Sequence, residues 1–170
     1  MGDKMRQVLK RGEVLTLLGH ELKPGVKAPD FVVVDKNQQT VKLSDFPGRV
    51  VIINAVPSLD TPVCNKQIVR FNQEAALLHN AVVMSVSMDL PFALDRFCGT
   101  FGIQNVKTTS DYRFHDFGLK YGTLIEELQI LTRAVFVIDK DGIIRYAEYV
   151  PEISELPDFD KALAAVNQSS

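Results

Sequence analysis

The sequence predicts an α/β fold with a mixed central sheet, flanking helices and an added N-terminal β-hairpin. Three observations predict it. Residues 50–55 and 81–86 are near-continuous apolar runs, which are typical of central strands buried on both faces. The segment between them has the periodicity of an amphipathic helix. An Asp-Gly pair between the apolar runs at residues 134–138 and 143–147 predicts an antiparallel hairpin, so the sheet must be mixed.

Two hairpins are predicted ahead of the first central strand, because short β-rich runs flank turn residues. Their strands are residues 7–9 with 14–17, and residues 31–34 with 40–43. A helix is predicted from Pro62 to about Leu78, with Ile68 and Phe71 on its buried stripe. Strand, helix and strand in this order make the two flanking apolar runs parallel, with a right-handed crossover.

The remaining helices are predicted to be short. They are residues 91–97, stopped by Gly99; residues 114–121, closed by Gly122; and residues 159–166, followed by a frayed tail at 167–170. This order of elements is that of a thioredoxin-like α/β sandwich. We expect one domain over residues 1–170, with the N-terminal hairpin within residues 1–22.

The composition excludes several classes of function. The 170-residue chain has a formal net charge of −2, which gives no electrostatic reason to expect nucleic acid or an anionic membrane as a partner. No apolar run approaches a membrane span, and the apolar stretch near the N-terminus is shorter than a signal core, so we expect a cytoplasmic protein. Its three histidines and two cysteines lack ligand spacing, so we expect no metal and no cofactor.

The residues before Cys64 are typical of a helix start. Thr61 is a natural N-cap and Pro62 suits the first helical position, which places Cys64 in the first turn. Unpaired N–H groups and the positive end of the helix dipole lie there, and both favour the nucleophilic thiolate. The alternative interpretation is a capped helix with an inert, buried cysteine.

Pro57, Thr61 and Cys64 match the Pro-x-x-x-Thr-x-x-Cys signature of the peroxiredoxins, and the chain resembles the thiol peroxidase branch of that family, the atypical two-cysteine type. Further blocks carry the resemblance over about residues 28–166: Arg70-Phe71-Asn72, residues 89–93, Arg96-Phe97-Cys98-Gly99 and Thr132-Arg133-Ala134. The Arg-Phe-Cys-Gly block distinguishes this branch, because peroxiredoxins as a class share only the first motif.

The resemblance implies a role for each of five residues. Cys64 is the peroxidatic cysteine and Cys98 the resolving cysteine, which together form an intramolecular disulfide. The Thr61 hydroxyl contacts thiolate and peroxide, Arg133 holds both, and Pro57 shields the thiolate from water. The implied activity is reduction of hydrogen peroxide and organic hydroperoxides in antioxidant defence, by a homodimer that thioredoxin recycles.

Two other interpretations compete with this one. Cys64 and Arg70 have the spacing of a cysteine phosphatase, but the residues between them contain no glycine and are predicted to be helical. A non-enzymatic redox sensor stays open, because a sensor and a peroxidase share the first chemical step. The preferred peroxide also stays open. Four apolar residues could line an approach to Cys64 that favours organic hydroperoxides, or could belong to the core: Met84, Met88, Leu90 and Phe92.

Overall fold

Seven strands form one mixed sheet in the computed structural model, which describes residues 5–169. The strand order is β4-β3-β7-β6-β5-β8-β9. Its centre is parallel and consists of β5 (Val50–Ala55), β6 (Ala81–Ser87) and β7 (Val106–Ser110). The outer strands pair antiparallel and are β3 (Val32–Asp35), β4 (Thr40–Lys42), β8 (Ala134–Ile138) and β9 (Ile144–Tyr149). The predicted mixed sheet is confirmed.

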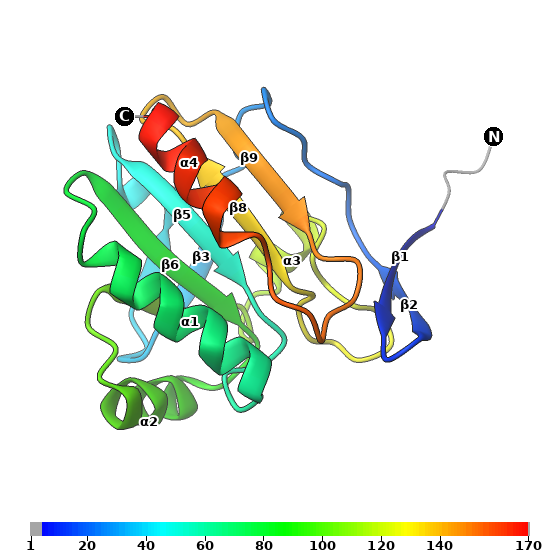
Figure 1. Ribbon diagram of the computed structural model, residues 1–170. Coiled ribbons are helices and arrows are strands. Elements are labelled where there is room, and N and C mark those ends of the chain that lie inside the picture. Colours follow the sequence, from blue (N-terminus) through cyan, green and yellow to red (C-terminus); the bar gives the residue numbers. More distant parts are fainter. Residues whose placement is uncertain (1–4, 170) are drawn as a thin grey trace.

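Helices cover both faces of this sheet (Figure 1). One face carries α1 (Pro62–Ala75), α2 (Pro91–Phe101) and α4 (Phe159–Ser169), and the other carries the short α3 (Asp116–Lys120). Strand β5 is buried at every position and supplies both faces. Ile52 belongs to the core cluster of α1, whereas Ile53 packs with Phe117 and Tyr121 on the other side, as the alternation of a strand requires.

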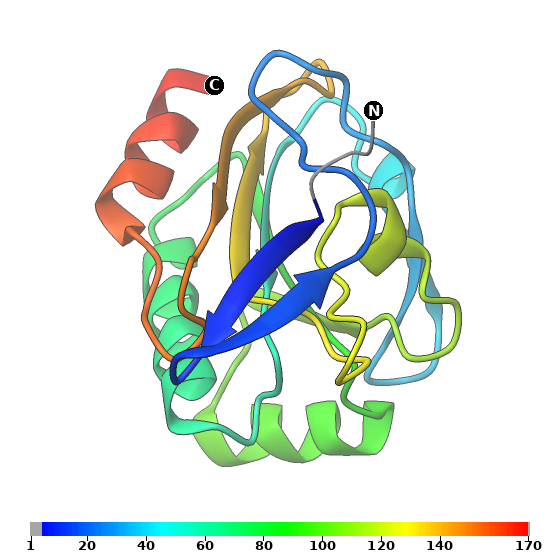
Figure 2. The same ribbon diagram turned by 90° about the vertical axis from the view of Figure 1, so that its right-hand side faces the viewer.

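The N-terminal hairpin lies apart from the main sheet. Strands β1 (Arg6–Lys10) and β2 (Glu13–Leu17) pair with each other in a separate two-stranded sheet, around a turn at Arg11-Gly12. Figure 2 shows the hairpin crossing one end of the molecule, between the side that carries α4 and the side that carries α3. Its apolar residues pack in a third, small core cluster with Ile125 and Ile153.

Strand β7 was not predicted from the sequence. It reads Val-Lys-Thr-Thr-Ser, so it lacks the apolar run that marks the other central strands. Thr108 and Thr109 are nevertheless buried, because each hydroxyl has a partner: that of Thr109 donates to the Ser85 carbonyl at 2.7 Å, and that of Thr108 lies 3.3 Å from Cys98 Sγ. Buried hydroxyls are tolerated where hydrogen bonds satisfy them.

The predicted stop at Gly99 is wrong. Helix α2 passes through Gly99, which is exposed, and ends at Gly102 with a left-handed φ of 64°. A glycine inside a helix costs only about 1 kcal/mol, whereas a left-handed cap favours glycine strongly.

Three other helices also differ from their predicted bounds. Helix α1 ends at Ala75, short of the predicted end near Leu78. Helix α3 starts later than predicted, at Asp116, because His115 takes a left-handed φ of 53°. Helix α4 continues to Ser169, whose hydroxyl donates to the Ala165 carbonyl at 2.6 Å. The expected tail is therefore helical up to Ser169. Ser170, the last residue of that tail, lies outside the described residues.

Candidate active site

Cys64 lies in the first turn of α1, just beyond the carboxyl end of β5. Thr61 is the N-cap, with extended backbone and its Oγ1 accepting a hydrogen bond from the Cys64 N–H at 3.3 Å. The Thr61 hydroxyl donates in turn to the Ser58 carbonyl at 3.1 Å. Pro57 is buried in the loop between β5 and α1. The local sequence therefore folds as predicted, and it places a fully buried thiol at the positive end of a helix.

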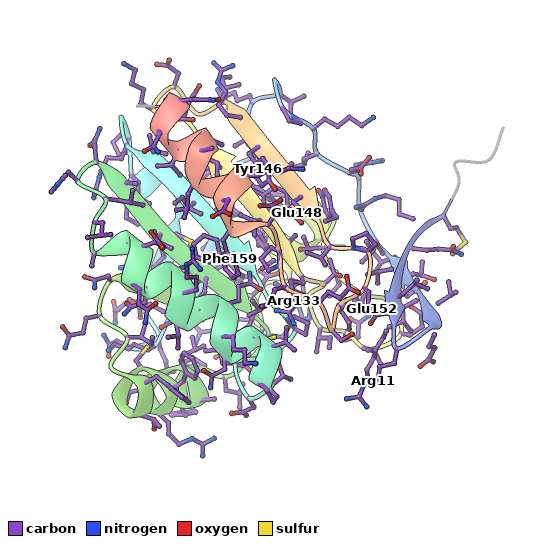
Figure 3. All side chains as sticks on the ribbon, viewed as in Figure 1. Arg11, Arg133, Tyr146, Glu148, Glu152 and Phe159 are labelled. Atoms are coloured by element: carbon purple, nitrogen blue, oxygen red, sulfur yellow. The ribbon has the colours of Figure 1, made fainter. Side chains whose placement is uncertain are left out.

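Arg133 reaches the same thiol from the loop before β8. Its Nη2 donates to Cys64 Sγ at 3.2 Å and to the Ile153 carbonyl at 2.8 Å, and its Nε donates to the same carbonyl at 2.9 Å. Its Nη1 donates to Gln67 Oε1 at 2.7 Å. Arg133 is 1% exposed and is the largest fully buried side chain of the described chain. Figure 3 shows it behind α1, close to the end of the sheet.

The charge of Arg133 has no carboxylate partner. Within residues 5–169, the ion pairs of Asp and Glu involve other basic residues, and the partners of Arg133 are a carbonyl, an amide and the thiol. Arginine keeps its proton in proteins, and an uncompensated buried charge is costly. Among the groups that Arg133 contacts, the thiol of Cys64 is the one that can become an anion.

Two amides that the sequence analysis missed complete the site. Gln67 lies one turn after Cys64 on the buried side of α1, and its Nε2 donates to Asn54 Oδ1 at 3.2 Å. Asn54 is a fully buried residue of β5, and its Nδ2 finds no partner among the described residues. The signal was present, because Asn54 is the one polar residue in an apolar central strand.

Cys98 lies in α2 and is 6% exposed, with its Sγ 3.3 Å from the Thr108 hydroxyl. Both cysteines are free thiols, although they belong to the same core cluster as Leu94 and Ile68. The structure thus brings Thr61, Cys64 and Arg133 into one hydrogen-bonded group and leaves Cys98 outside it.

A surface hollow of about 430 Å³ separates the start of α1 from α2. Thr61, Pro62 and Asn65 line one side, and Phe97 and Phe101 line the other, which places an apolar wall beside the N-cap of the active-site helix.

The four residues considered for an apolar approach separate into two groups. Met84 is fully buried and Met88 packs against the core, whereas Leu90 and Phe92 are 51% and 72% exposed.

Arg70 does not take part in the site. Its Nε pairs with Glu74 at 3.0 Å along the surface of α1, and the residues between Cys64 and Arg70 are helical. The loop that a cysteine phosphatase needs for phosphate is therefore replaced by helix, and that interpretation fails.

In the part of the chain that the structure describes, no helix is long and apolar enough to cross a membrane.

Known proteins are similar to this chain in sequence and in fold. Residues 23–163 match the family model described as Redoxin. The chain is 48% identical over 164 residues to the thiol peroxidase of Oceanobacillus iheyensis, a match that covers 96% of this chain and 100% of the relative. It is 45% identical over 161 residues to that of Bacillus subtilis, covering 95% and 96%. The crystal structure of a peroxiredoxin-like protein from Aquifex aeolicus has a TM-score of 0.92 and 45% identity, covering 99% of this chain and 100% of that one.

Proposed function

Given that this chain belongs to the redoxin family and, within it, to the thiol peroxidases, we propose that it reduces hydroperoxides through a sulfenic acid on Cys64 and a Cys64–Cys98 disulfide that thioredoxin reduces. The observation that carries the proposal is the 3.2 Å contact between Arg133 Nη2 and Cys64 Sγ inside a site without carboxylates for that arginine. It supports a thiolate nucleophile beside a permanent cation.

In the first step, the Cys64 thiolate attacks the terminal oxygen of the hydroperoxide. The S–O bond forms as the O–O bond breaks, so the sulfur is oxidised and the departing oxygen leaves as an alcohol or as water once it takes a proton. Negative charge grows on the departing oxygen, and an arginine donor held close to it stabilises that charge. The Thr61 hydroxyl, now donating to Ser58, turns to the peroxide oxygen in this proposal.

In the second step, Cys98 attacks the sulfenic sulfur of Cys64. The S–S bond forms as the S–O bond breaks, and the hydroxyl leaves as water with the proton of the Cys98 thiol. A disulfide needs Cα atoms within about 7 Å. Cys64 is held by its cap and Cys98 by the last turns of α2, where its carbonyl accepts from Gly102 and Ile103, so both segments must unwind. Thioredoxin then restores both thiols by dithiol exchange.

The proposal includes a homodimer in the cytoplasm. Three apolar side chains of the α2 region are exposed, namely Leu90, Phe92 and Phe101. Exposed large apolar side chains suit contact with another chain. Light scattering of the purified protein, compared with a Phe92→Ser variant, tests whether a second copy covers it.

The test of function is peroxide consumption with thioredoxin, thioredoxin reductase and NADPH, using hydrogen peroxide and an organic hydroperoxide in parallel. We expect sustained NADPH oxidation with the wild type, and none with Cys64→Ser. If the wild type consumes one equivalent of peroxide and then stops in the presence of active thioredoxin, the chain is a redox sensor or uses another reductant. If it consumes no peroxide, the proposal is wrong.

A further inference from the structure

We propose that the N-terminal hairpin is a positioning element of the active site, which fixes the Ile153 carbonyl that holds Arg133 against Cys64, and that Glu152 fastens the hairpin in place. This inference rests on the proposed function, since it concerns the same thiol. Its parts come from three distant segments of the chain: β1 and its turn, the loop after β9, and the start of β8.

The first step is the dependence of Arg133 on the loop after β9. Two of its side-chain donors, Nε and Nη2, converge on the Ile153 carbonyl at 2.9 Å and 2.8 Å. Its main-chain carbonyl accepts from the Val150 N–H at 3.0 Å. The direction in which Nη2 points to Cys64 Sγ is therefore set by the place of Ile153.

The second step is the attachment of that loop to the hairpin. Leu9 donates its N–H to the Pro151 carbonyl and accepts from the Ile153 N–H through its own carbonyl, both at 2.9 Å. Leu9 and Glu152 form a parallel bridge, so the loop pairs with β1 as a short third strand. The amide of Ile153 is bonded to the hairpin while its carbonyl is bonded to Arg133.

The side chain of Ile153 also packs against the hairpin. It is 6% exposed and packs in one cluster with Val8, Leu15 and Leu17 of the hairpin. Hydrogen bonds and apolar packing therefore both connect Ile153 to the hairpin. Without the hairpin this residue lies at the surface, and its carbonyl loses the support that aims Arg133.

Glu152 fastens the tip of the hairpin to the loop. Its Oε1 accepts from the Arg11 N–H and from the Ser154 hydroxyl, each at 2.8 Å, and its Oε2 lies 3.5 Å from the Gly12 nitrogen. Arg11 and Gly12 have φ values of 50° and 82°, which turn their N–H groups outward to the carboxylate. These donors hold the pKa of Glu152 below its ordinary value, so the ionised form that binds them prevails at neutral pH. Figure 3 labels Arg11, Glu152 and Arg133 along this path.

The experiment measures the reactivity of the Cys64 thiol itself. Reduced wild type, Glu152→Ala, Glu152→Gln and the matched control Glu155→Ala are alkylated with iodoacetamide over a range of pH, and peptide mass spectrometry follows Cys64. Glu155 is exposed on the same loop, and within residues 5–169 its one recorded hydrogen bond runs from its main-chain N–H to the Glu152 carbonyl. We expect Glu152→Ala to move the midpoint of the pH profile upward and to slow peroxide oxidation about tenfold, because small displacements of a positioned group reduce rates strongly.

Two comparisons separate positioning from stability. Glu152→Gln keeps an oxygen that can accept from Arg11, so its profile lies between wild type and Glu152→Ala, and Glu155→Ala matches wild type. Amide hydrogen exchange at Leu9 and Ile153 reports release of the hairpin. An unshifted Cys64 profile and an unchanged oxidation rate in Glu152→Ala overturn the inference, whether or not exchange rises. If wild-type Cys64 does not react with peroxide at all, the proposed function fails instead.

Discussion

Cys64 and Cys98 are both buried cysteines of one core cluster, yet the first lies beside a cation and the second beside a neutral hydroxyl. Cys64 lies in the first turn of α1 with Arg133 Nη2 at 3.2 Å. Cys98 lies in the last turn of α2 with a neutral hydroxyl, that of Thr108, at 3.3 Å. A helix start stabilises an anion and a helix end disfavours it, so the two thiols differ in their place along the helix dipole as well as in the nearest side chain.

This difference shows that burial does not determine the role of a cysteine here. Burial alone disfavours the thiolate, because a charge loses its hydration. At Cys64 a buried cation without a carboxylate partner lies within hydrogen-bond reach of the sulfur, whereas Cys98 has no such cation within that reach. This difference supports the proposed order, in which Cys64 reacts first and Cys98 second.

The largest effect is expected from removing the nucleophile. Cys64→Ser should abolish the first reduction of peroxide, because a serine hydroxyl is not ionised at neutral pH, and should leave the far-ultraviolet circular dichroism unchanged. Cys98→Ser is the matched variant in the same core cluster and should keep the wild-type rate of the first step, measured by stopped flow. Equal loss in both variants would show that the two thiols are not specialised.

A large effect is also expected from Arg133→Met. If Arg133 stabilises the thiolate and the transition state as proposed, loss of this donor should slow the first step about 10²-fold to 10³-fold. Stability should fall as well, because the Ile153 carbonyl and Gln67 Oε1 lose their buried donor. Urea unfolding and stopped-flow kinetics measure both quantities.

The control for Arg133→Met is Arg145→Met, which removes a half-exposed arginine. Arg145 pairs with Asp139 at 2.6 Å, and Asp139 follows β8 whereas Arg133 precedes it. It should leave the rate of peroxide reduction unchanged. A similar slowing in both arginine variants would mean that Arg133 does not act through its contact with Cys64.

A smaller effect is expected from Thr61→Val. The variant loses the N-cap acceptor of the Cys64 N–H, which should lower the free energy of unfolding by about 1 kcal/mol. It should also slow the first step, since no hydroxyl remains to meet the peroxide. Thr61→Ser keeps the hydroxyl and should restore both the stability and the rate. If serine does not restore the rate, the hydroxyl has no role in the first step.

The smallest effect is expected from Thr108→Val. This variant removes the hydroxyl beside Cys98 Sγ but keeps the shape of the side chain, so the cost in stability should be about 1 kcal/mol. The first step should keep its wild-type rate, because Thr108 contacts only the second thiol. Slower oxidation of Cys64 by peroxide in this variant would show that the surroundings of Cys98 affect the reaction of Cys64.

The local parts of the fold and site were predictable from the residues alone, and the place of Arg133 beside Cys64 followed from the resemblance, but other tertiary contacts were not predicted. The Thr61 cap and strand β5 follow from residues that are adjacent along the chain. Strand β7 escaped prediction, because its buried threonines are explained only by partners in β6 and α2. The positions of Gln67 and Ile153 around Arg133 likewise need the folded chain, since these residues are far apart in sequence.

The most direct test of the two roles is the product that one equivalent of hydrogen peroxide forms with the reduced wild type. Intact mass, non-reducing electrophoresis and peptide mapping should show a monomer that has lost two hydrogens and that contains a Cys64–Cys98 disulfide. Cys98→Ser should accumulate sulfenic acid on Cys64 and overoxidise with excess peroxide. A covalent dimer as the main wild-type product, or sulfenic acid on Cys98 in Cys64→Ser, would contradict the division of labour between the two thiols.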